Sequence, residues 1–276
     1  MSIFDQKVIK YEMKPLSSLE KVFPDETPVY RMECQMLSGL WGETVSFQVA
    51  YTGDFVMRER LDVRVVSELA EHVHVRTVEM VPVGRATNGI VDDNYLKTTS
   101  GLYPDLLKEL KDGKVIVYSR QWRSLWVDVD ITNEIPAGEY EIELQLIKEG
   151  EVVCSAKQKV TVIGTELPKL DIMHTEWMHA DCLADYYHVE VFSEEHWKLL
   201  ENYFQEYVKR DCNMMLTPLF TSPLDTAIGL ERTTCQLIDV EVKDGEYVFG
   251  FEKLKRWIDL CKKCGIEYFE ISHLFS

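Results

Sequence analysis

The spacing of the hydrophobic residues changes near residue 165, and this change divides the chain into two parts. Over residues 43–164, apolar and polar side chains alternate, as in the run Leu125–Ile131. A period of two is typical of strands with one buried face. Pro and Gly separate the runs, for example in Ile135–Glu139, as hairpin turns require. We therefore predict an antiparallel β-sandwich over residues 1–165.

Beyond Pro168, short apolar runs alternate with amphipathic helical patterns, which is typical of βαβ units. We predict that residues 166–276 form the first βα units of an incomplete (β/α)8 barrel. The chain would then be a two-part α+β protein. The expected strands are Leu170–His174, Asn213–Thr217 and Tyr268–Ser272, and the expected helices are Ser193–Arg210 and Phe251–Cys261.

The charge of the chain excludes several classes of partner. Its 276 residues carry a formal net charge of −17, with no Lys/Arg-rich run, so nucleic acid and anionic membranes are unfavourable partners. Met1–Val22 is interrupted by charged residues and lacks the apolar core of a secretory signal. No apolar stretch approaches the roughly 18 residues that a membrane span needs. We expect a cytoplasmic protein that binds neither nucleic acid nor membrane.

The seven cysteines are odd in number and scattered, unlike a secreted disulfide framework. Only Cys261 and Cys264 have a motif-like spacing, and they lie at the end of a predicted helix, without a second pair. A redox CxxC opens a helix, and a zinc site needs further ligands. His72 and His74 lie two residues apart on one face of a predicted strand and have no third ligand, which favours an ordinary polar strand face. We therefore expect reduced, structural thiols and no metal.

Polar and aromatic residues gather after the predicted strands of the second part, where active sites of βα folds are built. Tryptophan and tyrosine rings can stack on a pyranose, and carboxylate and imidazole groups can bond its hydroxyls. A metal site formed by His174, His179 and Asp181, with His273 as a further ligand, is the alternative, although the spacing matches no known signature. The candidate substrate-binding residues are Glu176, Trp177, His179, Asp181, Tyr186, Asp225 and His273.

The first part offers a different candidate. Residues 84–114 break the alternation and predict a long loop that contains Tyr103–Leu107, and long loops are often functional. Trp122 could stack on a sugar, although core packing is the more common role of a Trp that leads into a strand. A non-catalytic carbohydrate-binding or interaction module that uses the sandwich is therefore a second hypothesis.

Four segments of the second part form a recognisable series, in the order His174–Tyr187, Val191–Trp197, Leu216–Thr226 and Phe269–Phe275. Together they resemble the bacterial family of domain of unknown function 4091, which is related to glycoside hydrolase family 123. The resemblance implies a β-sandwich followed by a (β/α)8 barrel that hydrolyses terminal β-linked N-acetylhexosamine, specifically N-acetylgalactosamine, with retention. It implies substrate-assisted catalysis, in which an Asp polarises the acetamido group and an adjacent Glu is the general acid and base, without metal or organic cofactor.

The chain departs from this family at the catalytic pair. Its only Asp-Glu dipeptide is Asp25-Glu26, which lies in a Pro-flanked segment before the alternating strand pattern that begins at residue 43. Residues 166–276 supply only about three of the eight βα units of a barrel, so we expect the pair beyond Ser276 and no activity from this chain alone. A third strand without a neighbour would leave an open edge, through which we expect the chain to self-associate.

Overall fold

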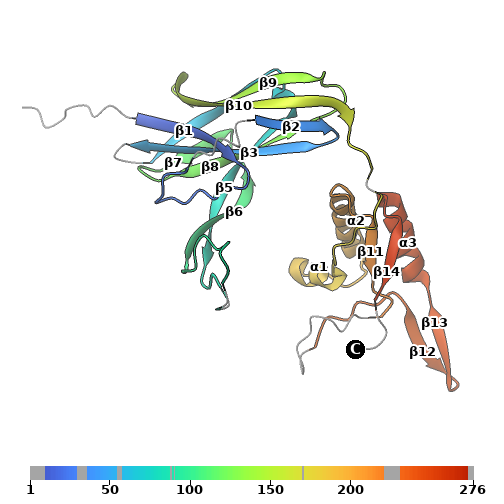
Figure 1. Cartoon of the computed structure of the whole chain (residues 1–276). Helices are drawn as coiled ribbons and strands as arrows, with labels where there is room; N and C mark the ends of the chain where they lie inside the picture. The colour runs from blue at the N-terminus through green and yellow to red at the C-terminus, as the bar shows by residue number, and fades with distance from the viewer. Residues whose placement is uncertain are drawn as a thin grey trace, which may run out of the picture. The chain divides into compact units, whose positions relative to one another are not determined.

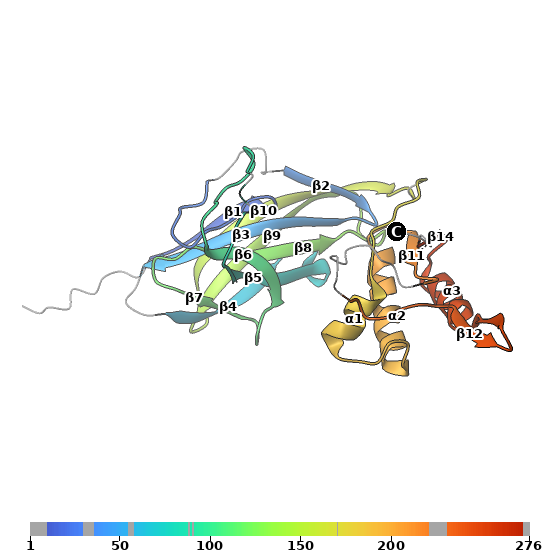
Figure 2. The same cartoon turned by 90° about the horizontal axis from the view of Figure 1, so that it is seen from below.

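A computed structural model describes residues 10–29, 36–54, 58–87, 89, 91–169, 171–220 and 231–272. The chain divides into two compact units, Met1–Pro168 and Lys169–Ser276, and each is described by itself (Figures 1 and 2). None of the helices in these described ranges is long and apolar enough to cross a membrane.

Ten strands and a short 3-10 helix, Ala70–His72, make up the described part of the N-terminal unit. The strands are β1 (Lys10–Ser17), β2 (Met36–Trp41), β3 (Thr44–Asp54), β4 (Glu59–Val66), β5 (Val73–Val83), β6 (Gly101–Glu109), β7 (Lys114–Val117), β8 (Arg123–Asp130), β9 (Gly138–Lys148) and β10 (Glu151–Glu166). They form two five-stranded sheets, with the orders β1-β3-β8-β5-β6 and β2-β10-β9-β4-β7.

The alternation in the sequence places one row of each strand in the core between these sheets. Leu125 and Val127 of β8 are fully buried, as are Ile142 and Leu144 of β9. Each such side chain contributes about 1.5–3 kcal/mol by leaving water. The structure therefore confirms the predicted strands. The prediction that the sandwich is antiparallel is wrong for one sheet. In that sheet β2 pairs with β10 in parallel, so the sheet is mixed.

The predicted long loop between residues 84 and 114 is partly wrong. Its second half is β6, which pairs with β5 in antiparallel register. The register shifts where Met80 faces Pro104 and Glu79 faces Leu106, so one residue bulges out of the ladder. A proline that cannot donate to the ladder is tolerated at such a bulge on an edge strand. Pro104 therefore concealed a strand that the sequence pattern alone did not indicate.

The described C-terminal unit holds three helices and four strands. They are α1 (Ala180–Tyr187), α2 (Glu194–Val208), β11 (Met214–Thr217), β12 (Asp239–Lys243), β13 (Glu246–Gly250), α3 (Glu252–Cys264) and β14 (Tyr268–Ile271). Only β11 and β14 form a parallel pair, while β12 and β13 form a separate antiparallel hairpin. The expected partial (β/α)8 barrel is therefore wrong, because β-structure outweighs helix in the described chain and neither described sheet of this unit has more than two strands.

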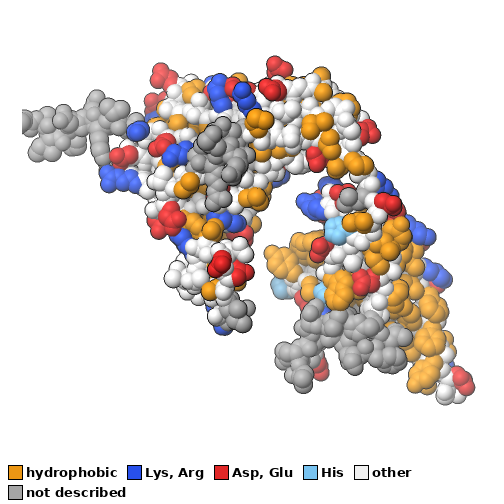
Figure 3. Space-filling model, viewed as in Figure 1, with side chains coloured by type: hydrophobic (Ala, Val, Ile, Leu, Met, Phe, Trp, Pro, Cys, Tyr) orange, Lys and Arg blue, Asp and Glu red, His pale blue; other side chains and the backbone are white. Residues whose placement is uncertain are grey.

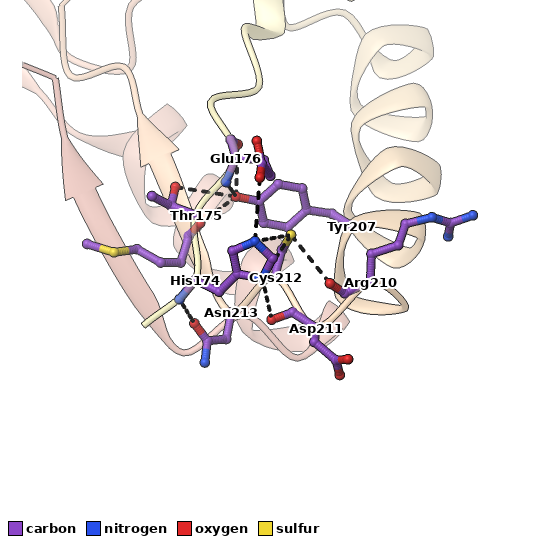
Figure 4. Close-up of polar contacts among 9 residues, drawn as sticks. His174, Thr175, Glu176, Tyr207, Arg210, Asp211, Cys212 and Asn213 are labelled. Atoms are coloured by element: carbon purple, nitrogen blue, oxygen red, sulfur yellow. Dashed lines mark hydrogen bonds and ion pairs between the residues drawn. The ribbon is translucent and has the colours of Figure 1, made fainter. Parts of the chain in front are cut away.

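The expected first strand, Leu170–His174, illustrates why. Residues 171–179 form no strand. They are held beside β11 by side chains and by the His174 carbonyl, which accepts the Asn213 and Met214 N–H groups, each at 3.1 Å. The Asn213 side-chain oxygen accepts the His174 backbone N–H at 2.8 Å. The Tyr207 hydroxyl accepts the Glu176 N–H at 2.7 Å and lies 2.7 Å from the Met214 carbonyl (Figure 4). Beyond His174, the Tyr207 hydroxyl is therefore one of the contacts that join this segment to β11.

The core of the C-terminal unit is small and aromatic. Trp257 of α3 is fully buried, and its ring meets Phe204 and Trp197 of α2 edge to face, with centroids 5.0 and 6.5 Å apart. Ser193 begins α2 by accepting the His196 N–H, and Gly265, with φ of 102°, ends α3. These aromatic contacts, more than the short sheet, hold the helices together.

Cys261 lies in this aromatic core. Its side chain is fully buried, and burial raises the pKa of the thiol well above its ordinary value. A thiol in such an apolar place stays protonated and unreactive. The Cys261–Cys264 spacing therefore reflects one buried helix face.

Candidate functional site

The indole of Trp177 is exposed and held in place by a carboxylate from a distant part of the chain. Its side chain is 50% exposed, and its Nε1–H donates to Glu270 Oε2 at 3.0 Å. Glu270 lies near the C-terminal end of β14, the position at which βα folds present functional side chains. A fixed apolar ring beside an acceptor for hydroxyl groups is the arrangement that binds a sugar.

Asp181 is committed to a buried ion pair. It lies in the first turn of α1, and Arg232 reaches both of its oxygens, with Nη2 3.0 Å from Oδ1. The two side chains are only 9% and 14% exposed. Both oxygens of the carboxylate are therefore engaged by Arg232. Nothing in the sequence pattern pointed to Arg232, which lies 51 residues away.

His179 lines a small cavity together with this ion pair. The cavity holds about 10 Å³, which is room for about one water molecule and far too little for a sugar ring. A sugar would therefore lie over this part of the unit and not inside it. The other lining residues are Met178, Ala180, Leu216, Pro218, Cys235 and Ser272.

Glu176 projects into solvent from a rigid backbone. Its side chain is 76% exposed, and one oxygen lies 3.5 Å from His174 Nε2. Its backbone N–H is held by the Tyr207 hydroxyl, and burial raises the pKa of that tyrosine (Figure 4). The hydroxyl therefore stays protonated at neutral pH. A carboxylate that is exposed on a fixed backbone is available to a ligand.

Tyr186 belongs to an exposed aromatic group on α1 and α2. It is 76% exposed, and its ring stands edge to face against Tyr187, with centroids 5.0 Å apart. The hydroxyls of Tyr187 and Tyr203 are 3.0 Å apart. The group offers aromatic faces to solvent, which suits either a sugar or a protein partner.

The metal hypothesis finds no support within the described ranges, where no three His, Cys, Asp or Glu side chains are grouped to hold an ion. His174 lies beside Met214 at the start of β11, whereas His179 lies near Pro218, beyond its end. Four strand residues span more than about 10 Å, too far for two ligands of one ion. Asp225 and His273, two further candidates, lie outside the described residues.

His196 is a structural residue that sequence reasoning missed. It is fully buried, its Nδ1 accepts the Phe192 N–H at 2.9 Å, and its Nε2 lies 2.9 Å from the Ala180 carbonyl. This pattern requires a neutral ring with its proton on Nε2. Burial lowers the pKa of His196, which agrees with a neutral ring. The ring fixes the start of α1, and so the position of Asp181.

The C-terminal unit is similar to a known protein family. The family model described as glycoside hydrolase 123, catalytic domain, matches residues 177–276, beginning at Trp177. No curated protein sequence matches the chain. The matched residues lie within the C-terminal unit.

The solved structures include a family 123 glycoside hydrolase from Clostridium perfringens that was analysed for glycolipid glycan hydrolysis. It superposes with a TM-score of 0.67 at 14% identity and covers 94% of this chain. At this identity the likeness shows a shared fold, and the chain spans 46% of the length of that enzyme. A β-glucosidase from Listeria innocua gives a TM-score of 0.27 at 10% identity, covering 58% of this chain and 17% of its own, which is too weak to bear on the fold.

Proposed function

We propose that the C-terminal unit forms a sugar-binding surface of a glycoside hydrolase that acts on terminal β-linked N-acetylhexosamine, with N-acetylgalactosamine as the preferred sugar. The observation that carries this proposal is the half-exposed Trp177, fixed by Glu270 at the end of β14, within the segment that matches the family 123 catalytic domain. The resemblance of four segments to domain of unknown function 4091 supports the choice of sugar.

The proposed roles follow from exposure. Trp177 stacks on the apolar face of the sugar, and Glu270 and Glu176 accept hydroxyl hydrogen bonds. Tyr186 offers a second aromatic face to the remainder of the glycan. Asp181 and His179 contribute by holding the backbone beside the sugar in place. Asp181 does so through its ion pair with Arg232. Asp225 and His273 complete the proposed set.

The chemistry proposed for the whole enzyme is substrate-assisted and retaining, with the acetamido oxygen of the sugar as nucleophile. This mechanism needs an adjacent Asp and Glu. Asp25 and Glu26, the one such dipeptide in the sequence, both lie near Lys97 Nζ in the N-terminal unit, at 3.5 and 2.7 Å. We therefore propose that this chain binds the sugar without hydrolysing it.

Turnover of a chromogenic β-N-acetylgalactosaminide by the purified chain tests the second half of this proposal. The expected rate equals the uncatalysed background. Turnover that is lost in Glu176→Gln or Asp181→Asn would contradict the proposal and would place catalysis next to α1. Turnover that survives both variants would also contradict it and would place catalysis elsewhere in the chain.

A second candidate is glycan binding by the sandwich. Trp122 cannot serve, because it is buried and Lys14 Nζ lies 4.9 Å from its ring centre. Tyr103, however, lines a groove of about 370 Å³ with Phe23 and Tyr95. Retained glycan binding by a chain that ends near Gly164, and its loss in Tyr103→Ala, would favour this candidate.

Self-association through the open edge of β14 is a further part of the proposal. Tyr268 and Ile271 of this strand are 42% and 51% exposed, and the described strands pair with it on one side only. An unpaired apolar edge invites pairing with another strand. Sedimentation of the wild-type chain should show concentration-dependent association that Ile271→Lys abolishes, and a monomer at every concentration would contradict this part.

A further inference from the structure

The sandwich contains a cavity of about 760 Å³ where its two sheets end. β6 is the last strand of one sheet and β7 the last strand of the other, and residues 110–113 join them directly (Figure 2). Side chains of β4, β5, β6 and β7 line the cavity, together with Tyr51 and Arg123. Small-molecule sites in proteins have volumes of about 300–1,000 Å³, so the size is that of a binding site.

Arg123 occupies an inward-facing position at the end of the core. It lies opposite Tyr51 in the β3–β8 ladder, and side chains two residues apart on a strand share a face. Leu125 and Val127, which continue its row, are fully buried in the core between the sheets. A guanidinium in such a row is unusual, because the burial of a charge without a partner is costly.

The guanidinium lacks a strong acceptor. Its Nε is buried and has no hydrogen-bond partner, and Nη2 reaches the Gln121 side chain only at 3.4 Å. The Tyr118 ring centre lies 5.0 Å from its Cζ. Among the described residues, no carboxylate lies within 4.0 Å of Arg123. Buried donors in proteins are nearly always paired, so this orphaned donor points to a missing acceptor.

The lining is cationic in a chain that is strongly acidic. The three acidic side chains are already engaged, because Lys148 binds Glu59, Arg76 binds Glu109 and the Thr77 hydroxyl donates to Glu79. Four of the six cations have no carboxylate within 4.0 Å in the described chain. Cationic side chains lining a concave wall concentrate anions there. The four unpaired cations are Arg58, Lys108, Lys111 and Arg123.

We propose that this cavity binds a carboxylated sugar, a hexuronate or an oligosaccharide that contains one, with its carboxylate on Arg123. The planar guanidinium fork matches a carboxylate through two parallel hydrogen bonds. The hydroxyls of Thr77 and Tyr118 can bond sugar hydroxyls, and Leu102 and Met80 offer apolar contact to a ring face. The site is separate from the surface around Trp177 and does not depend on the function proposed for it.

Glu79 provides the sharpest test, because it lies on the same wall. In the β5–β8 ladder Thr77 faces Leu125, so Glu79 and Arg123 hold neighbouring inward positions. If Arg123 existed only to pair with Glu79, removal of either charge would weaken the fold and no anion would bind. Under the proposal, Glu79 repels the ligand carboxylate, so Glu79→Gln strengthens binding.

The experiment is calorimetric titration of the full 276-residue chain with D-glucuronate, in parallel with D-glucose and acetate. We expect D-glucuronate to bind at least about tenfold more tightly than either control, because it alone combines the carboxylate with the ring. Arg123→Gln should lose at least about tenfold in affinity, and Glu79→Gln should gain affinity.

A second variant at two exposed cations tests the proposal even if Arg123→Gln does not fold. Lys108→Gln combined with Lys111→Gln removes charge at the rim without touching the core, and should weaken D-glucuronate binding while leaving thermal unfolding unchanged. Equal binding of D-glucose would overturn the role of the carboxylate, and equal binding of acetate the role of the sugar. No binding of D-glucuronate, or weaker binding in Glu79→Gln, would overturn the proposal as a whole.

Discussion

The two units bury their hydrophobic surface in different ways. In the sandwich, two five-stranded sheets cover each other, so the inward rows of β8 and β9 are fully buried. In the C-terminal unit, a parallel pair of four-residue strands packs with the helices, and the hairpin β12–β13 exposes Tyr247 at 70% and Phe249 at 50%. Figure 3 shows hydrophobic side chains gathered over this unit. Its stability therefore depends on a few large side chains and side-chain hydrogen bonds.

The largest expected effect is that of Trp257→Ala. The indole of this α3 residue is fully buried against α2, so its removal should cost about 3–5 kcal/mol and unfold the C-terminal unit first. Native-state hydrogen exchange at increasing urea concentrations should show that the backbone amides of this unit lose protection while those of the sandwich keep it. Trp257→Phe should cost less, because Nε1 has no partner within the described chain. Simultaneous loss of protection in both units would contradict the independence of the two cores.

Asp181→Asn should be nearly as costly. It leaves the Arg232 guanidinium buried without its charge partner, a change that typically costs about 3–5 kcal/mol. The double variant Asp181→Leu with Arg232→Met should recover much of that loss, because no charge is then left unpaired. Additive losses in this double-mutant cycle would show that the two side chains act separately.

Tyr207→Phe should have an intermediate effect. The phenyl ring keeps its packing, but the Glu176 N–H and the Met214 carbonyl lose the hydroxyl between them. We expect a loss of about 1–3 kcal/mol. Hydrogen exchange should become faster at residues 174–178 and stay unchanged in α3. Slower exchange, or new protection in this segment, would show that the hydroxyl prevents a regular strand.

The smallest effect is a pH dependence carried by His196. Burial lowers its pKa below the ordinary value of about 6.5, so the unfolded chain binds the proton more readily. The stability contributed by the neutral ring is complete above about pH 6.5 and decreases as the pH falls below it. Denaturant titrations of the C-terminal unit between pH 7 and 5 should show this decrease, and His196→Gln should flatten it. His188→Asn, an exposed control at a left-handed position, should retain the decrease.

The sequence predicted individual strands and helices better than it predicted which of them pair. The alternation predicted most of the sandwich strands between β3 and β10, but not β6, and the helical patterns that begin at Ser193 and Phe251 predicted α2 and α3. The sequence did not reveal that β2 pairs with β10 in parallel, because no local pattern encodes the direction of a strand far along the chain. The expected barrel failed for a related reason, since periodicity does not show how many strands join one sheet, and only β11 and β14 pair in parallel in this unit.

The candidate site shows the same limit. Trp177 and Asp181 were chosen as functional residues by their place after a predicted strand, but their partners come from far along the chain. Glu270 lies 93 residues from Trp177, and Arg232 lies 51 residues from Asp181. Exposure distinguishes the two, because Trp177 is presented to solvent whereas Asp181 is enclosed. That distinction depends on tertiary packing, which hydrophobic periodicity does not specify.

The indole N–H signal of Trp177, followed by NMR during titration with methyl β-N-acetylgalactosaminide, tests the central claim most directly. The account predicts a saturable shift of this signal, and loss of binding in Trp177→Ala. Phe249→Ala, which removes another half-exposed aromatic ring from the same unit, should bind like the wild type. A Trp177 signal that does not move with the sugar, or binding that survives Trp177→Ala, would contradict a sugar-binding surface at this position.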